Sequence, residues 1–235
     1  TSFRRQDLFD HKNENFAGCF GTSVSPKLID STKNSDLIIV LGARLGEMTT
    51  QGYSIISPQD ISKNIIHIHV DPNELNKVFN ANVCINVGVN ECCDRLEELT
   101  QDNSNRWKEW RNELNKNYLE DSKPKKNRNI NNLSKIFEIV EKKFPTNSII
   151  TLDAGNNAAW PQRFLSFGRT RRQIASTCGS MGYAIPAAVA SALSNPEKAV
   201  LCCVGDGGFM MSSQEISTAV HYGAKIIILL INNSS

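Results

Sequence analysis

The residues best suited to chemistry lie in two short polar stretches, each of which follows an apolar run. Gly205–Gly208 reads GDGG and follows the run AVLCCV, and Asn232–Asn233 follows the run KIIILLI. We expect both runs to be buried strands. Carboxylate and amide oxygens are ligands that Mg²⁺ prefers, and Mg²⁺ often shares its coordination sphere with phosphate groups. Asp206 and Asn233 therefore predict a magnesium site, provided that the fold brings the two strand ends together.

The segment between the two runs indicates how they meet. A helical pattern at Ser213–Tyr222, with a capping box predicted at Ser212 and Glu215, separates strands expected at Ala199–Val204 and Lys225–Ile231. Such a strand–helix–strand unit makes the two strands parallel. Open parallel sheets bind ligands beyond the carboxyl ends of their strands, so the acidic residue and the asparagine would meet there. The glycines of GDGG would let the backbone approach phosphate groups.

Apolar runs alternate with helical patterns along the rest of the chain, which indicates an α/β protein. Other elements are expected as strands at Leu37–Leu41, Ile65–Val70, Val83–Val87 and Ser148–Asp153, and as helices at Leu133–Lys143 and about Gly182–Leu193. A polar stretch from Glu91 to about Glu120 is also helical in pattern. Its large apolar residues are predicted to be buried, namely Leu96, Leu99, Trp107, Trp110, Leu114 and Leu119.

The fold class predicted from these patterns is α/β, with two Rossmann-like three-layer αβα domains whose sheets are mostly parallel. Residues 1–121 would form a central domain with a trailing helix, and residues 133–235 a second domain that is incomplete at its C-terminus. Residues 122–132, SKPKKNRNINN, are basic and asparagine-rich, so we interpret them as a linker. Because the chain stops directly after an expected buried strand, we expect it to be a fragment of a longer protein.

Composition argues against several classes of protein. The sequence is 40% hydrophobic and 21% charged with a net charge of +2, which suits a globular protein and gives no sign of a nucleic-acid or membrane partner. The longest apolar run, Ile226–Ile231, is far shorter than the roughly 20 residues that cross a bilayer. No signal peptide is recognisable, so a cytoplasmic location is expected. The seven cysteines show no CxxC spacing, which argues against a disulfide framework or zinc site.

GDG at residues 205–207, followed by NN at residues 232–233, resembles the metal–diphosphate motif of thiamine diphosphate-dependent enzymes. Four further stretches resemble that family in the same order. SFRRQDLFDHKNENFAGCFG (2–21) and DLIIVLGARLGE (36–47) are similar to the central domain of its acetolactate synthase and pyruvate oxidase branch. DAGNNAAW (153–160) resembles the loop that opens the diphosphate-binding site, and CGSMGYAIPAA (178–188) the GTMG segment of acetolactate synthases.

The resemblance implies roles for individual residues. Asp206 and Asn233 would ligate Mg²⁺, together with the carbonyl of Ser235. Met181 would wedge between the two rings of the cofactor, and the Gly179 carbonyl would accept a hydrogen bond from its aminopyrimidine. From the residues alone, Met181 also fits a flexible gap-filler in a core. The implied cofactor-binding set is Gly155, Asn156, Asn157, Gly179, Met181, Gly205, Gly207 and Gly208.

The activity implied by the resemblance is thiamine diphosphate- and Mg²⁺-dependent carboligation and decarboxylation of 2-oxo acids, with two pyruvates giving acetolactate and CO2. The family's activating Glu lies in an N-terminal domain that this sequence lacks, so no catalytic residue is assigned and the isolated chain is expected to be inactive. The family's cofactor lies between subunits, which implies a homodimer or tetramer of the full-length protein. A related decarboxylase, oxidase or glyoxylate carboligase stays open, as do a non-catalytic nucleotide-binding protein and a structural remnant.

The first domain offers weaker signals. Gly42, Arg44 and Gly46 follow an expected buried strand and could touch a nucleotide, as flavin does in some members of the family, so FAD is kept as a second candidate cofactor. Their spacing matches no complete dinucleotide-binding fingerprint, and a purely structural domain explains them equally well. His67 and His69 share one strand face but lack a third ligand at a recognisable spacing, which favours a structural role.

Overall fold

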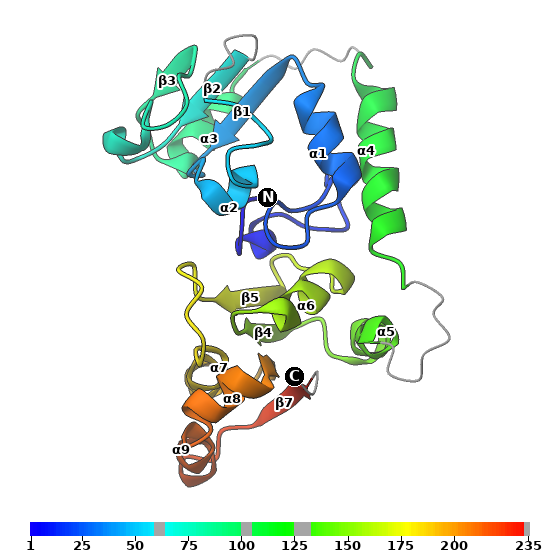
Figure 1. The fold of residues 1–235 in the computed structure, drawn as a ribbon, viewed down its shortest axis with the longest axis vertical. Helices are drawn as coiled ribbons and strands as arrows, with labels where there is room; N and C mark the ends of the chain where they lie inside the picture. The colour runs from blue at the N-terminus through cyan, green and yellow to red at the C-terminus, as the bar shows by residue number, and fades with distance from the viewer. Residues whose placement is uncertain (59–63, 100–104, 125–132, 233–235) are drawn as a thin grey trace.

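Two parallel sheets organise the chain, one in each half of the sequence (Figure 1). The structure is a computed structural model that describes residues 1–58, 64–99, 105–124 and 133–232. The first sheet has the strand order β1-β2-β3 and the second the order β5-β4-β6-β7. Every strand pairs with its neighbours in parallel. The predicted α/β class with mostly parallel sheets is therefore confirmed.

The first sheet is small and only partly covered. Its strands are β1 (Leu37–Leu41), β2 (Asn64–Ile68) and β3 (Val83–Ile85), and its helices are α1 (Pro26–Lys33), α2 (Glu47–Thr50), α3 (Val89–Glu97) and α4 (Lys108–Asp121). Short 3-10 turns lie at Gln6–Leu8 and Pro72–Glu74. The core consists of apolar side chains from the strands and loops, namely Val40, Ile55, Ile56, Ile65 and Phe79. At the sheet edge, Ile39 of β1 is 60% exposed.

The predicted burial of the large apolar residues between Glu91 and Glu120 is wrong. Five of them are exposed, namely Leu96, Leu99, Trp107, Trp110 and Leu119, and Leu114 is only half-buried. Two separate helices, α3 and α4, stand where one helical stretch was expected, and α4 packs against α1. An apolar stripe predicts which side of a helix prefers burial, but it does not supply a partner to cover that side.

The second sheet has central strands, β4 and β6, that are buried on both faces. Its strands are β4 (Ser148–Leu152), β5 (Arg171–Ala175), β6 (Ala199–Gly205) and β7 (Ile226–Ile231). Its helices are α5 (Leu133–Lys143), α6 (Ala159–Phe164), α7 (Ala184–Ser194), α8 (Asp206–Ser212) and α9 (Glu215–His221). One core joins β4 and β6 to Phe137 of α5, and a separate core joins them to Ala184, Ile185 and Ala188 of α7. Helices thus cover both faces of the sheet, as in a three-layer αβα arrangement.

The connection from β6 to β7 differs from the prediction. Two helices, α8 and α9, replace the single helix expected at residues 213–222. The predicted capping box is wrong, because Ser212 lies within α8 and donates its hydroxyl to Gly208 O instead. Gln214 is the N-cap residue of α9 and makes no side-chain capping bond. GDGG therefore begins a helix of its own directly after the strand.

The N-terminal segment lies against the second sheet and its helices (Figure 1). Gln6 Nε2 donates to Gln162 O at 3.3 Å, the His11 amide donates to Phe167 O at 3.1 Å, and Asp7 pairs with Arg172 at 2.7 Å. This segment precedes the first sheet in sequence, but these polar contacts connect it to the second sheet and its helices. Residues 125–132 of the predicted linker lie outside the described residues. Within the described part of the chain, no helix has both the length and the apolarity to cross a bilayer.

Candidate functional site

The candidate site lies where three parallel strands end. Leu152 of β4 pairs in register with Cys203 of β6, and Gly205 pairs with Ile231 of β7. The residues that follow these strands therefore come out at one edge of the sheet. Asp206 and Asn232 are neighbours at this edge by register, whereas Asn233, the predicted partner of Asp206, lies outside the described residues.

Only part of the predicted metal-ligand set can be placed. Asp206 is half-buried and is the first residue of α8. Its carboxylate has no hydrogen bond or ion pair with another described residue. Asn233 and Ser235 lie outside the described residues. One carboxylate at this edge is thus available for a cation.

The loop after β4 touches the GDGG segment. Gly155 has φ +105°, a conformation that other residues rarely adopt, and it leads into a 3-10 turn at Asn156–Ala158. The Asn157 side chain lies directly against Gly205, where a Cβ atom would come within 2.7 Å of Asn157 Nδ2. Asn157 Oδ1 is buried and makes no hydrogen bond within the described part of the chain. Buried amide oxygens normally have a partner, so this oxygen is an unmet acceptor at the site.

The second loop holds Met181 over the same segment. Gly179 and Gly182 flank it with φ +76° and +78°, values that favour glycine. Met181 Cε lies 3.1 Å from the position that a Cβ atom on Gly207 would take. The Met181 side chain is nevertheless 49% exposed. Because a core gap-filler would be buried, this exposure does not fit a gap-filling role.

Asp153, to which the sequence motifs assigned no role of its own, links these loops. Its side chain is fully buried and accepts hydrogen bonds from the backbone N–H groups of Ala154, Gly182 and Ala184, at 2.8, 3.1 and 3.0 Å. A Cβ atom on Gly208 would come within 2.6 Å of Asp153 Oδ1. An ionisable residue directly after a wholly buried strand was the signal that could have identified it.

This arrangement suits a magnesium–diphosphate group. Gly205, Gly207 and Gly208 lie where added side chains would collide with Asn157, Met181 or Asp153, so the backbone here stays bare and close to its neighbours. Bare backbone at a strand end presents N–H groups that can bind phosphate oxygens. The half-buried carboxylate of Asp206 and the unpaired Asn157 oxygen add acceptors on the same edge. The residues present therefore fit both the cation and the diphosphate.

Comparison with known families agrees with this geometry. Residues 1–96 match the family described as thiamine pyrophosphate enzyme, central domain, and residues 153–235 match thiamine pyrophosphate enzyme, C-terminal TPP binding domain. The chain belongs to the thiamine pyrophosphate enzymes. Thiamine pyrophosphate is another name for thiamine diphosphate, so the resemblance inferred from the motifs is confirmed.

The individual relatives are named as acetolactate synthases. The large subunit from Buchnera aphidicola subsp. Schizaphis graminum is 30% identical over 86% of the chain, and that from Corynebacterium glutamicum is 28% identical over the whole chain. A probable large subunit from Methanocaldococcus jannaschii is 31% identical over 84% of it. The aligned region spans only 35%, 38% and 34% of these three relatives.

A cavity of about 640 Å³ is lined by residues from both halves of the chain. Gly42, Arg44 and Gly46 line it from the loops after β1, and Thr177 and Cys178 line it from the loop that leads to Met181. The three residues singled out as nucleotide contacts thus share one cavity. His67 and His69 are buried nearby, where His67 Nε2 lies 3.0 Å from Ala43 O and His69 Nδ1 accepts the Asp71 N–H at 3.0 Å. These backbone contacts fit the structural role expected of both histidines.

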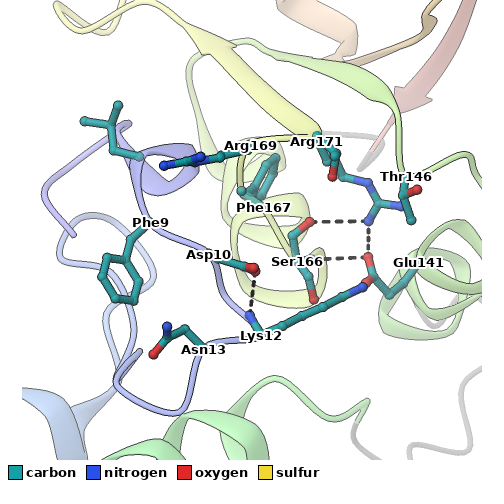
Figure 2. A pocket seen from close by; sticks show the side chains of 13 residues that line it. Phe9, Asp10, Lys12, Asn13, Glu141, Thr146, Ser166, Phe167, Arg169 and Arg171 are labelled. Carbon is teal, nitrogen blue, oxygen red and sulfur yellow. Dashed lines mark hydrogen bonds and ion pairs between the residues drawn. The ribbon is translucent and has the colours of Figure 1, made fainter.

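Another cavity, of about 380 Å³, lies at the amino-terminal start of β5, away from the thiamine pyrophosphate motifs. Figure 2 shows Arg171 and Glu141 paired beside Ser166, whose amide donates to the Glu141 carboxylate. Asp10 and Lys12 close the other side from the N-terminal segment. None of the described residues predicted to bind cofactor or metal lines this cavity.

Proposed function

We propose that this chain contributes the diphosphate- and Mg²⁺-binding half of a thiamine diphosphate-dependent enzyme of the acetolactate synthase type. The proposed reaction joins two molecules of pyruvate to give acetolactate and CO2. The observation that carries this proposal is the meeting of the Gly155–Asn157, Gly179–Gly182 and Gly205–Gly208 segments at one sheet edge. The names of the relatives favour this reaction over simple decarboxylation, oxidation or glyoxylate carboligation.

The roles proposed for the residues follow from their places. Asp206 would hold Mg²⁺, with Asn233 and the Ser235 carbonyl as further ligands beyond the described residues. The backbone of Gly155 and Asn156, together with Gly205, Gly207 and Gly208, would receive the diphosphate. When bound, the cofactor supplies a carbon nucleophile for the 2-oxo acid carbonyl and an electron sink for loss of CO2.

The ring end of the cofactor would meet the second loop. The Met181 side chain is half-exposed and lies beside the backbone of Gly207, which suits a side chain that supports a bent ligand. The Gly179 carbonyl would accept a hydrogen bond from the aminopyrimidine, and Gly179 is exposed, so a ligand can approach it. The activating Glu is assigned to none of the residues of this chain. We propose that a pyrimidine-binding domain supplies it within a homodimer or tetramer.

A calorimetric titration with thiamine diphosphate in excess Mg²⁺ tests the assignment of Asp206. Wild type, Asp206→Ala and Asp94→Ala are compared, because Asp94 is an exposed residue of α3 whose loss changes the charge equally. Loss of a carboxylate ligand is expected to weaken binding at least tenfold in Asp206→Ala alone. Equal affinity of all three proteins would refute the metal role. Weakening by both variants alike would show a general charge effect instead.

We also propose a flavin nucleotide as a second ligand, held in the cavity that Gly42, Arg44 and Gly46 line. The support is that residues from both halves of the chain converge there on a volume of about 640 Å³, within the range of small-molecule sites. Titration with FAD, followed by flavin fluorescence, is expected to show binding that Arg44→Ala weakens and Arg106→Ala does not. Binding that is unchanged in Arg44→Ala, or absent in wild type, would leave the first domain with a structural role.

A further inference from the structure

Asp153 is a buried carboxylate whose partners are almost all backbone groups of the cofactor loops. Oδ1 accepts from the amides of Ala154 and Gly182, and Oδ2 accepts from the amide of Ala184. The Arg4 guanidinium donates to the Asp153 carbonyl at 3.1 Å and is itself 4% exposed. Burial lowers the pKa of Arg4, whereas the charges of Asp153 and Cys178 oppose that shift. Charge and hydrogen bonds are thus concentrated on a residue that no predicted site contact includes.

Asp153 holds the loop that carries Met181 at the point where that loop enters α7. The first N–H groups of a helix have no partner within the helix, and Tyr183, the N-cap residue of α7, makes no side-chain capping bond. Asp153, directly after β4, supplies that cap by accepting the Ala184 amide. Thr151, two residues earlier on β4, donates its hydroxyl to Ala184 O at 2.9 Å. Both backbone groups of Ala184 are therefore held by β4 and the residue directly after it, and Ala184 lies two residues after Gly182, where the turn around Met181 ends.

The first turn of α8 packs against the same carboxylate. Gly208, in the first turn of α8, approaches so closely that a Cβ atom would stand 2.6 Å from Oδ1 and 2.8 Å from Cγ of Asp153. Gly207 instead faces the flexible end of Met181 at 3.1 Å. The carboxylate thus sets the distance between the turn that carries Met181 and the helix that carries Asp206.

We propose that Asp153 is a positioning residue of the cofactor site. Its carboxylate fixes the Gly179–Gly182 turn against the first turn of α8. Met181, which would support the cofactor's rings, and the backbone that would bind the diphosphate are thereby arranged before the cofactor binds. This role rests on the proposed function, because it concerns the same cofactor. Its carboxylate accepts hydrogen bonds from backbone amides, so in this role it acts through the backbone groups of the two loops.

Asp153→Asn is the sharpest change, because it keeps the size of the side chain and replaces one acceptor oxygen with a donor that faces an N–H group. Calorimetry with Mg²⁺ and thiamine diphosphate is expected to show at least tenfold weaker binding, which corresponds to about 1.4 kcal/mol. Phe137→Leu and Phe137→Ala serve as controls, because Phe137 is fully buried in the core on the other face of the sheet and its loss lowers stability alone.

The outcomes separate this inference from the proposed function. Failure of wild type to bind would refute the proposed function, and the positioning role would fall with it. Binding by wild type that Asp153→Asn retains within twofold, or that the Phe137 variants weaken as much at equal loss of melting temperature, would overturn the positioning role alone.

Amide hydrogen exchange gives a second readout that needs no cofactor and survives a poorly folded Asp153→Asn protein. Gly208→Ala adds a methyl group against the carboxylate, whereas Gly207→Ala adds the same group one residue away against Met181. Exchange at the Gly182 and Ala184 amides is expected to quicken at least tenfold in Gly208→Ala and little in Gly207→Ala. Equal exchange in the two variants would mean that the carboxylate does not couple the two loops, and would overturn the proposal.

Discussion

Cys178 and Cys203 show how strongly position decides the chemistry of one side chain. Cys178 is exposed in the loop before Met181, and hydrogen bonds from the Ser176 and Ser180 side chains lower the pKa of its thiol to about 7. Cys203 is fully buried in β6, and burial raises the pKa of its thiol well above the usual range. Of these two thiols, we expect only Cys178, in the loop beside the candidate site, to form a thiolate near neutral pH.

Alkylation by iodoacetamide, followed residue by residue with mass spectrometry, tests this difference. Because the thiolate reacts and the thiol does not, the Cys178 rate is expected to rise as the pH passes upward through about 7. Ser176→Ala removes the hydrogen bond that contributes most, so the midpoint should move to higher pH. Cys203 should stay unmodified in folded protein. A Cys178 rate that still climbs above pH 9 with no midpoint near 7 would contradict the account.

At the residue scale, the sequence predicted the residues proposed to bind the cofactor better than the residues that hold them in place. Asp206 and the glycines around it were recognisable because GDGG follows an apolar run, and the structure brings them to the expected edge. Asp153 was assigned no role of its own, because its importance lies in contacts with Gly182, Ala184 and Gly208, all distant in sequence. A local pattern shows where a strand ends but does not show which distant amides the next side chain accepts.

At the element scale, the strands were predicted by their own apolar residues, and the elements missed were those that depend on partners. β1 matches its predicted bounds of Leu37–Leu41, as α5 matches Leu133–Lys143. β5 was missed because its sequence RRQIA is polar at its start. In the structure Arg171 is buried, since it pairs with Glu141 and donates to Phe144 O. The partners that compensate for the burial of Arg171 come from α5 and the residue after it, so the sequence of the strand alone does not reveal them.

The contact between the loop after β4 and the end of β6 gives a test at the element scale. Gly205→Ala places a methyl group where Asn157 Nδ2 would be 2.7 Å away, so the amide must move. We expect the variant to lose about 1–3 kcal/mol in urea unfolding, the usual cost of overpacking. Asn157→Ala removes the obstacle, so the double variant should recover much of that loss. Strictly additive losses would show that the two loops do not touch.

At the scale of the whole molecule, the N-terminal segment carries polar contacts between the halves of the chain. Arg4, Gln6 and His11 reach the second sheet and its helices, although they precede the first sheet in sequence. Composition and periodicity gave no indication of this docking, because it depends on long-range hydrogen bonds rather than on an apolar pattern. The loop after β4 is thereby connected to the N-terminal segment through Arg4.

The pair between Asp7 and Arg172 tests this connection. Asp7 is 5% exposed, whereas the Arg172 side chain is 44% exposed. Arg172→Ala would leave a buried carboxylate unpaired, and because solvent still reaches the site we expect a loss of about 1–2 kcal/mol in unfolding free energy. Arg172→Ala in an Asp7→Asn background should cost much less. Equal costs in both backgrounds would show that the pair contributes nothing.

The central claim is that this chain binds the diphosphate end of the cofactor through Mg²⁺. The most direct measurement is one calorimetric series on the wild-type chain with thiamine diphosphate, inorganic diphosphate and thiamine, each in Mg²⁺ and in EDTA. We predict that both diphosphate compounds bind in Mg²⁺, that neither binds in EDTA, and that thiamine does not bind. Thiamine binding as tight as that of thiamine diphosphate, or diphosphate binding that survives EDTA, would contradict the assignment of the site.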